Sequence, residues 1–142
     1  MDVAELASLL GTHGVGVLAT TTSHNEPMAL PVSYVVLNGT PLVRTPRGSG
    51  CHAHIDTDAP VSLLVHEGTS WPALRGVTIN GHAEVVDGAD LAASVVEAVD
   101  TRFAEVTRRP ESEAATTSAE YVVLRITASH GVTTWDNRKA RA

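Results

Sequence analysis

The sequence predicts a mainly β protein of the α+β class, in which about six strands form one antiparallel sheet closed into a barrel. Three observations support this fold class. Runs rich in β-branched residues follow one another at short intervals, and turn sequences such as Asn38-Gly39 separate them. Helical and strand-like segments do not alternate as in parallel α/β folds, so a doubly wound sheet is not expected. Two helices complete the fold, a short one at the start and a longer one near residues 89–106.

The first residues predict the short helix. Asp2 is a suitable N-cap, and Glu5 stands three residues later as its capping-box partner. Val3, Leu6 and Leu10 then lie on one face of the helix. We expect the helix to end in the segment 11–14, which begins and ends with glycine.

The strands are expected in the β-rich runs 15–20, 29–37, 42–45, 61–66, 77–86 and 121–128. Pro31 lies inside the second run, so we expect it at a sheet edge or a bulge, because proline cannot donate to the ladder. Asn38 and Gly39 both tolerate positive φ and predict a tight hairpin. The run 77–86 alternates, and its inward-facing side is expected to carry Val77, Ile79, Gly81, Ala83 and Val85.

The longer helix is predicted from a regular apolar spacing after the fifth strand. Leu91, Val95, Val99 and Phe103 recur every four residues and form one apolar face. Residues 108–110, Arg-Arg-Pro, mark its end. A polar connector is expected over 111–118, and an ordered tail over 132–139.

Composition limits the classes of function. Val, Leu, Ile and Phe make up 35 of the 142 residues, enough for a folded core. A formal net charge of −6 lacks the basic footprint of a nucleic-acid-binding protein. The single cysteine fits a reducing compartment. The apolar run 29–37 is too short for a membrane helix, and the acidic start does not resemble a signal peptide. We therefore expect one cytoplasmic domain over residues 1–142, with no membrane or nucleic-acid partner.

The segment 45–50, Thr-Pro-Arg-Gly-Ser-Gly, is the strongest candidate for a binding site. It lies where a strand is expected to give way to a short helix. Gly48 and Gly50 would let a ligand approach the backbone closely. Backbone amides at a helix start, a hydroxyl group and the guanidinium of Arg47 together favour an anion such as phosphate. The alternative is an ordinary surface turn with a solvated arginine.

Other candidate residues allow more than one interpretation. Cys51, His52 and His54 suggest a metal site, but zinc needs three or four converging ligands and the sequence holds no second cluster of the usual spacing. Whether folding brings other histidines near them, such as His66, His82 or His130, is left open. We therefore expect no metal. Trp71 and Trp135 stand in loop-like segments and suit either stacking on a flat ligand or a structural contact.

The catalytic residues are left unassigned by the sequence. The known motifs of nucleophilic and metal-dependent hydrolases are absent from the sequence. An enzyme that relies on a redox cofactor stays open, because the protein then mainly binds and orients.

Several motifs occur in a characteristic order: GVLAT (16–20), LPV (30–32), LNGTPLVRTPRGS (37–49), INGHAEVVD (79–87) and WDNRK (135–139). In this order and spacing, residues 15–87 resemble the pyridoxamine 5'-phosphate oxidase-like split β-barrels, especially small actinobacterial members that bind FMN or the deazaflavin coenzyme F420. The resemblance implies a six-stranded antiparallel split barrel. It also implies a homodimer with two cofactor sites at the subunit interface.

The resemblance assigns expected roles to individual residues. Pro31, Val32 and Ser33 would run beside the ring system of FMN or F420. The phosphate would be held by Thr45, Arg47 and Ser49. Trp71 and Trp135 would reach the site of the partner subunit. The implied activity is hydride transfer between the cofactor and a small conjugated acceptor; the alternative is a non-catalytic module that binds flavin, deazaflavin or haem on the same fold.

One departure from the family pattern affects this expectation. Members usually continue after the serine with basic residues, in a pattern like S-R-K-A-x-N-L, whereas Gly50 and Cys51 follow Ser49 here. Two cations beside the phosphate are missing, each a contact of about 1.5–3 kcal/mol when well formed. Either the cofactor binds weakly, or the ligand differs, or Arg44 takes part in binding.

Overall fold

The computed structural model describes residues 1–22, 24–50, 55, 59–86, 97, 101, 104–105 and 121–139. In chain order the elements are α1 (Val3–Thr12), β1 (Val15–Thr21), β2 (Pro27–Leu37), β3 (Thr40–Pro46), β4 (Ala59–Glu67), the 3-10 helix η1 (Trp71–Ala73), β5 (Arg75–Val86), β6 (Tyr121–Thr127), β7 (Val132–Asp136) and the 3-10 helix η3 (Asn137–Lys139).

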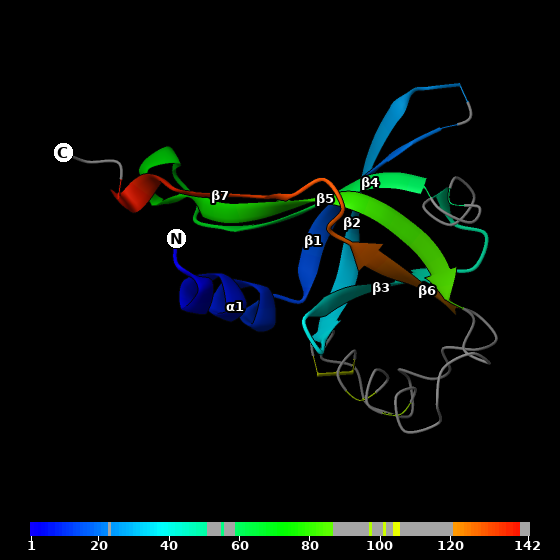
Figure 1. Ribbon diagram of the computed structural model, residues 1–142, viewed down its shortest axis with the longest axis horizontal. Helices are drawn as coiled ribbons and strands as arrows, with labels where there is room; N and C mark the ends of the chain where they lie inside the picture. Colours follow the sequence, from blue (N-terminus) through cyan, green and yellow to red (C-terminus); the bar gives the residue numbers. More distant parts are fainter. Residues whose placement is uncertain are drawn as a thin grey trace.

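Six strands form the barrel that the sequence predicts. They pair antiparallel in the order β4-β1-β2-β3-β6-β5, and the pairing of β4 with β5 closes the sheet (Figure 1). The long strand β5 makes closure possible. Its second half pairs with β6 and its first half with β7, while β4 follows its other edge.

Alternate residues of each strand fill the barrel. Leu18, Leu63, Val77 and Leu124 are fully buried there, and β5 alternates as expected from Val77 to Glu84. The alternation then ends, because Val85 is only half-buried whereas Val86 is buried. Tyr34 is the largest fully buried side chain, and its hydroxyl donates to the carbonyl oxygen of Leu10 at 2.7 Å. This hydrogen bond fastens α1 to the barrel without leaving the phenol unpaired.

Helix α1 begins as predicted. The Asp2 carboxylate accepts from the Glu5 backbone N–H at 2.8 Å, and the Glu5 carboxylate accepts from the Asp2 N–H at 2.9 Å. The predicted apolar face is wrong in one respect, because Val3 is 84% exposed whereas Leu9 is buried. The side chains of α1 that pack on the barrel core are those of Leu6, Leu9 and Leu10.

The predictions for the Asn38-Gly39 hairpin and for Pro31 are confirmed. Asn38 has a φ of 52° and Gly39 a φ of 78°, as a tight hairpin requires. Pro31 pairs with Val17 of β1, whereas the ladder to β3 begins only at Ser33. Pro31 therefore lies at a sheet edge on its β3 side, where no strand needs its missing N–H.

The C-terminal tail, expected only to be ordered, contains a seventh strand. β7 pairs with residues 75–79 of β5, whose other edge pairs with residues 63–67 of β4, and the three segments form an arm that leaves the barrel beside α1 (Figure 1). The ammonium group of Lys139 donates to both carboxylate oxygens of Glu5 at 2.8 and 2.9 Å. This ion pair links the end of the arm to α1.

Several predicted segments lie outside the described residues. They include most of the helix expected over 89–106, although residues 97, 101, 104 and 105 are described and helical. The connector 111–118 and residues 51–54 also lie outside. Within the described ranges, no helix combines the length and apolarity that crossing a membrane requires.

Candidate cofactor-binding site

The end of β3 and the turn after it form a small polar cradle, which we define as Thr45, Arg47, Gly48 and Ser49. The Thr45 and Ser49 side-chain oxygens lie 2.7 Å apart and share a hydrogen bond. The Ser49 N–H donates to the Pro46 carbonyl at 3.0 Å, which closes the turn. Gly48 has a φ of 77°, a conformation that favours glycine, and nothing lies within 4 Å of the position of a Cβ there.

The chemistry of the cradle suits an anion. When one hydroxyl of the Thr45–Ser49 pair donates to the other, the acceptor keeps its own proton for an outside group. Thr45 is buried and Ser49 half-buried, whereas Arg47 is exposed on the turn. Two hydroxyl groups and a guanidinium provide a donor set that fits a phosphate group.

Gly50, the residue after the cradle, lies close to two side chains of β2. A Cβ at this position would lie 3.3 Å from Met28 Cε and 3.5 Å from Leu30 Cδ1. The backbone after Ser49 therefore packs directly on two side chains of β2. This packing holds the cradle against the end of the barrel.

Ser33 and Arg44 are direct cross-strand partners beside the cradle. Val32 is a core residue, whereas Pro31 is exposed and Ser33 half-buried. Consecutive side chains of a strand point to opposite faces. Arg44 therefore lies on the outer face of the sheet with Ser33, whereas its neighbour Thr45 faces the other way. Arg44 is nonetheless only 6% exposed.

Trp135 lies in β7 and Trp71 in η1, which contacts η3 at the end of the arm. The cradle instead follows β3, and Figure 1 shows β3 in the barrel, away from β7. Trp135 is half-buried, and a Cβ on its cross-strand partner Gly76 would lie 2.6 Å from its ring. The indole therefore fills the space that glycine leaves. Trp71 is 78% exposed, and its carbonyl accepts from the Asn137 side-chain amide at 2.8 Å. Of the two rings, that of Trp71 is the one open to an outside contact.

Ion pairs hold the arm and α1 in place. A hydrogen bond from Arg75 and, to a lesser extent, one from His13 lower the pKa of Glu67 below its ordinary value. The Asp136 side chain is buried and accepts two hydrogen bonds from the Arg138 guanidinium, at 2.9 and 2.7 Å, which lower its pKa strongly. These carboxylates therefore stay charged at neutral pH and into mild acid.

Thr20 is a buried polar residue near the cradle that the sequence analysis does not include among the candidate site residues. It is 4% exposed, and its hydroxyl has no hydrogen-bond partner among the residues that the structure describes. It pairs across the sheet with Met28, whose side chain lies against Gly50. The signal was present in the sequence, because Thr20 occupies the same inward-facing register as Gly16 and Leu18, where an apolar residue is expected.

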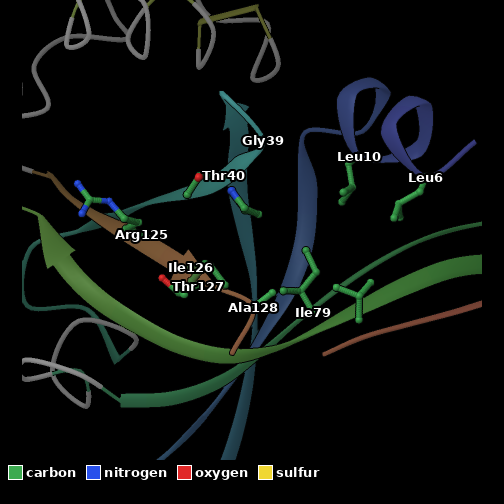
Figure 2. A pocket seen from close by; sticks show the side chains of 11 residues that line it. Leu6, Leu10, Gly39, Thr40, Ile79, Arg125, Ile126, Thr127 and Ala128 are labelled. Atoms are coloured by element: carbon green, nitrogen blue, oxygen red, sulfur yellow. The ribbon is translucent and has the colours of Figure 1, made fainter. Parts of the chain in front are cut away.

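A pocket lies at the end of β3 that is opposite the cradle (Figure 2). It has a volume of about 340 Å³, between α1, the β2–β3 turn, β5 and β6. Leu6 and Leu10 point from α1 toward the strand that carries Ile79 (Figure 2). Thr40 lines this pocket, whereas Thr45, five residues further along β3, lies in the cradle. Five strand residues span about 17 Å, so the pocket and the cradle are separate sites. The mainly apolar walls distinguish the pocket from the polar cradle.

The metal hypothesis for Cys51, His52 and His54 concerns residues outside the described ranges. Within the described residues, no three or more His, Cys, Asp or Glu side chains converge on a common point. The two cations that the family pattern places after Ser49 are replaced by Gly50 and Cys51. Arg47 is thus the cationic member of the cradle.

The closed six-stranded antiparallel barrel with a seventh strand on β5 defines the class of small split-barrel proteins. The pyridoxamine 5'-phosphate oxidase family matches residues 2–132. The chain belongs to this family.

Solved structures show the same fold. A conserved hypothetical protein from Mycobacterium tuberculosis is 26% identical with a TM-score of 0.81, over 99% of this chain and 88% of the other. The FAD binding protein from Mycobacterium smegmatis is 23% identical with a TM-score of 0.65, over 95% and 94%. The heme storage protein HutZ from Vibrio cholerae is 14% identical with a TM-score of 0.70, over 92% of each chain. No curated protein matches the chain significantly.

Proposed function

We propose that this protein is an oxidoreductase that binds FMN or the deazaflavin F420 through its phosphate and serves a small conjugated acceptor. The observation that carries the proposal is the cradle, where the Thr45–Ser49 hydroxyl pair, 2.7 Å apart, adjoins Arg47 and the open position beside Gly48. When bound, the reduced cofactor supplies a hydride. Split-barrel proteins of the same fold that bind FAD support a flavin-type ligand.

The residues of the chain would bind and orient. Arg47, Thr45 and Ser49 would donate to the phosphate, and the backbone at Pro31 and Val32 would run along the ring edge. Ser33 and Arg44 lie on the outer face beside that segment, where they would contact the cofactor between its two ends. No side chain of the cradle is a general acid or base at neutral pH, so we assign no proton transfer to it.

We further propose that the functional unit is a homodimer. The outer face of β1 and β2 carries small apolar residues, among them Val15 with 62% exposure and the exposed Ala29 and Pro31. Burial of such a face would stabilise a dimer. The exposed ring of Trp71 at the end of the arm would then be available to the partner's site.

The test is equilibrium dialysis of the full chain against FMN and F420 in parallel, with the absorbance retained per chain as the readout. We expect one of them to be retained near stoichiometry. Arg47→Ala should lower its affinity about 10- to 100-fold, the range of one charge-assisted hydrogen bond of about 1.5–3 kcal/mol. Arg125→Ala is the matched control, because this arginine pairs with Glu84 at 2.7 Å on another part of the barrel. Unchanged affinity in Arg47→Ala would reject the cradle as the phosphate site.

A second candidate function is a non-catalytic module for flavin, deazaflavin or haem. The replacement of two expected cations by Gly50 and Cys51 favours it, because phosphate then binds with fewer charge-assisted contacts. Tight binding without reduction of a quinone, an enone and a tetrapyrrole would support this alternative. Turnover of any of them would reject it.

We also propose that residues 1–142 form one domain that works in the cytoplasm. The single cysteine supports this location, because unpaired thiols are typical of a reducing compartment. Fractionation of cells that express the chain would test it.

A further inference from the structure

The turn between β6 and β7 lies directly on strand β5. A Cβ on Gly81 would lie 1.7 Å from the Thr127 carbonyl oxygen, so only glycine lets the turn cross there. The His130 N–H donates to the Asn80 carbonyl, and the Asn80 N–H donates to the Gly131 carbonyl, both at 3.0 Å. The backbone of the turn is thereby fixed relative to β5.

This crossing brings two histidines together that are far apart in the sequence. The ring centres of His82 and His130 lie 5.0 Å apart, with the ring planes inclined by 50°. The His82 Nδ1 atom lies 2.6 Å from the Ser129 hydroxyl oxygen. A pocket of about 380 Å³ adjoins the pair, lined by His82, Glu84, Thr127 and Ser129.

The separation of the rings fits shared coordination of one ion. A metal–imidazole bond is about 2.0 Å long, and the ring centre lies about 1.1 Å beyond the nitrogen. Two imidazoles in adjacent positions on one ion therefore have their centres about 4.4 Å apart at the 90° angle of a tetragonal ion and about 5 Å apart at a tetrahedral angle. The observed 5.0 Å lies close to this range, so rotation of the two side chains would let one nitrogen of each ring reach a shared ion.

The Ser129 hydroxyl gives His82 a partner of the kind that metal-binding histidines have. When Nδ1–H donates to Ser129, the lone pair of Nε2 is available to a metal. Metal-binding histidines commonly donate their second N–H in this way, which fixes ring orientation and tautomer.

We propose that His82 and His130 form a binding site for a borderline divalent transition-metal ion, with Cu²⁺ bound most tightly and water completing its coordination. Imidazole suits such ions, and affinity among them peaks at Cu²⁺. Among the described residues no third His, Cys, Asp or Glu joins the pair, so the site binds more weakly than a structural zinc centre.

The site is separate from the cradle. Val122 pairs with Thr45, whereas Thr127, five residues further along β6, pairs with His82. Five strand residues span about 17 Å. Metal binding therefore goes beyond the proposed function, and it stands or fails independently of cofactor binding.

The first experiment titrates the full-length protein with Cu²⁺ and follows the ring signals of its seven histidines by NMR. Because paramagnetic Cu²⁺ broadens only nearby nuclei, we expect the His82 and His130 signals to broaden first and together. Broadening of other histidines while these two stay sharp would overturn the proposal, and would leave the pair as a ring contact only.

The second experiment measures Cu²⁺ affinity of variants by competition with a chelator. His82→Ala and His130→Ala should each lower the affinity at least tenfold, whereas His66→Ala, which removes an exposed histidine on β4, should not change it. Ser129→Ala should lower the affinity about tenfold and leave the two-nitrogen signature in the Cu²⁺ EPR spectrum. His130 is exposed, so its variant keeps the fold, which circular dichroism verifies. Unchanged affinity in His130→Ala would overturn the proposal.

Discussion

Thr45 and Ser49 share a 2.7 Å hydrogen bond between their side-chain oxygens, across the turn that ends β3. Thr45 is 4% exposed, so its hydroxyl depends on a protein partner rather than on water. Ser49, which is half-buried, supplies that partner. The contact therefore stabilises the turn, and in the proposed site it would leave one hydroxyl proton for a phosphate group.

Removal of Ser49 should affect both stability and binding. Ser49→Ala leaves the buried Thr45 hydroxyl without this partner, which should cost about 1–3 kcal/mol of unfolding free energy. Cofactor affinity should fall about tenfold with the loss of one donor. Urea denaturation and equilibrium dialysis measure the two effects. Thr133→Val, on the exposed side of β7, is the control, and an equal effect of both changes would contradict the role of the pair.

Gly76→Ala should displace the ring of Trp135. The added Cβ would lie 2.6 Å from the ring and 2.8 Å from the Val65 carbonyl oxygen, so either the ring or the strand must move. We expect a loss of about 1–3 kcal/mol in unfolding free energy and a shift in tryptophan fluorescence. Gly11→Ala is the matched control. Apart from the backbone of its own helix and its chain neighbours, no atom of the described residues lies within 4 Å of its Cβ position. Alanine in a helix should stabilise by about 0.5–1 kcal/mol.

Much of the barrel could be predicted from local sequence. The capping box of Asp2 and Glu5, the Asn38-Gly39 hairpin and the alternation along β5 depend on neighbouring residues, and the structure has all three. β7 was not predicted as a strand because its burial pattern does not alternate and its identity depends on pairing with β5. Local signals cannot supply a long-range partner.

The candidate site shows the same division. The Thr45–Ser49 contact lies within one turn, and Gly48, which adopts a positive φ, is the local signal that predicts this turn. The pairing of Ser33 with Arg44 depends on register between two strands, which the sequence alone left open. The contact of His82 with His130 depends on the crossing at Gly81, for which the sequence has no local signal.

Thr20→Val should raise stability. The Thr20 hydroxyl is buried and, within the described part of the chain, has no hydrogen-bond partner, so the folded protein bears its desolvation cost. Valine has nearly the same shape, and its introduction should increase the unfolding free energy by about 1 kcal/mol. Thermal unfolding of the cofactor-free protein measures the change. A decrease of similar size would mean that Thr20 has a polar partner after all.

Glu67→Gln should remove part of the acid sensitivity of the arm. Arg75 and His13 lower the pKa of Glu67 in the folded protein, so the ionised form contributes stability above the unfolded pKa, near 4.5. This contribution is lost as the pH falls through the lower, folded pKa. The wild type should therefore exceed the variant in stability at pH 6, and the difference should shrink below pH ~4.5. Denaturation at a series of pH values tests this, with Glu26→Gln in the β1–β2 turn as the control.

Val15→Lys should separate a dimer into single chains without unfolding them. Val15 is 62% exposed in the single chain and lies next to Ser33 on the outer face, so a lysine there is readily hydrated. In a dimer formed through this face, two lysines would instead be desolvated, which is unfavourable. Light scattering should give a mass near 30 kDa for the wild type, twice the 14.9 kDa of one chain, and near 15 kDa for the variant.

Val3→Lys, which changes an 84% exposed valine on α1, should keep the wild-type mass. A wild-type mass near 15 kDa would contradict the proposed assembly, and with it the supply of Trp71 to a partner's site.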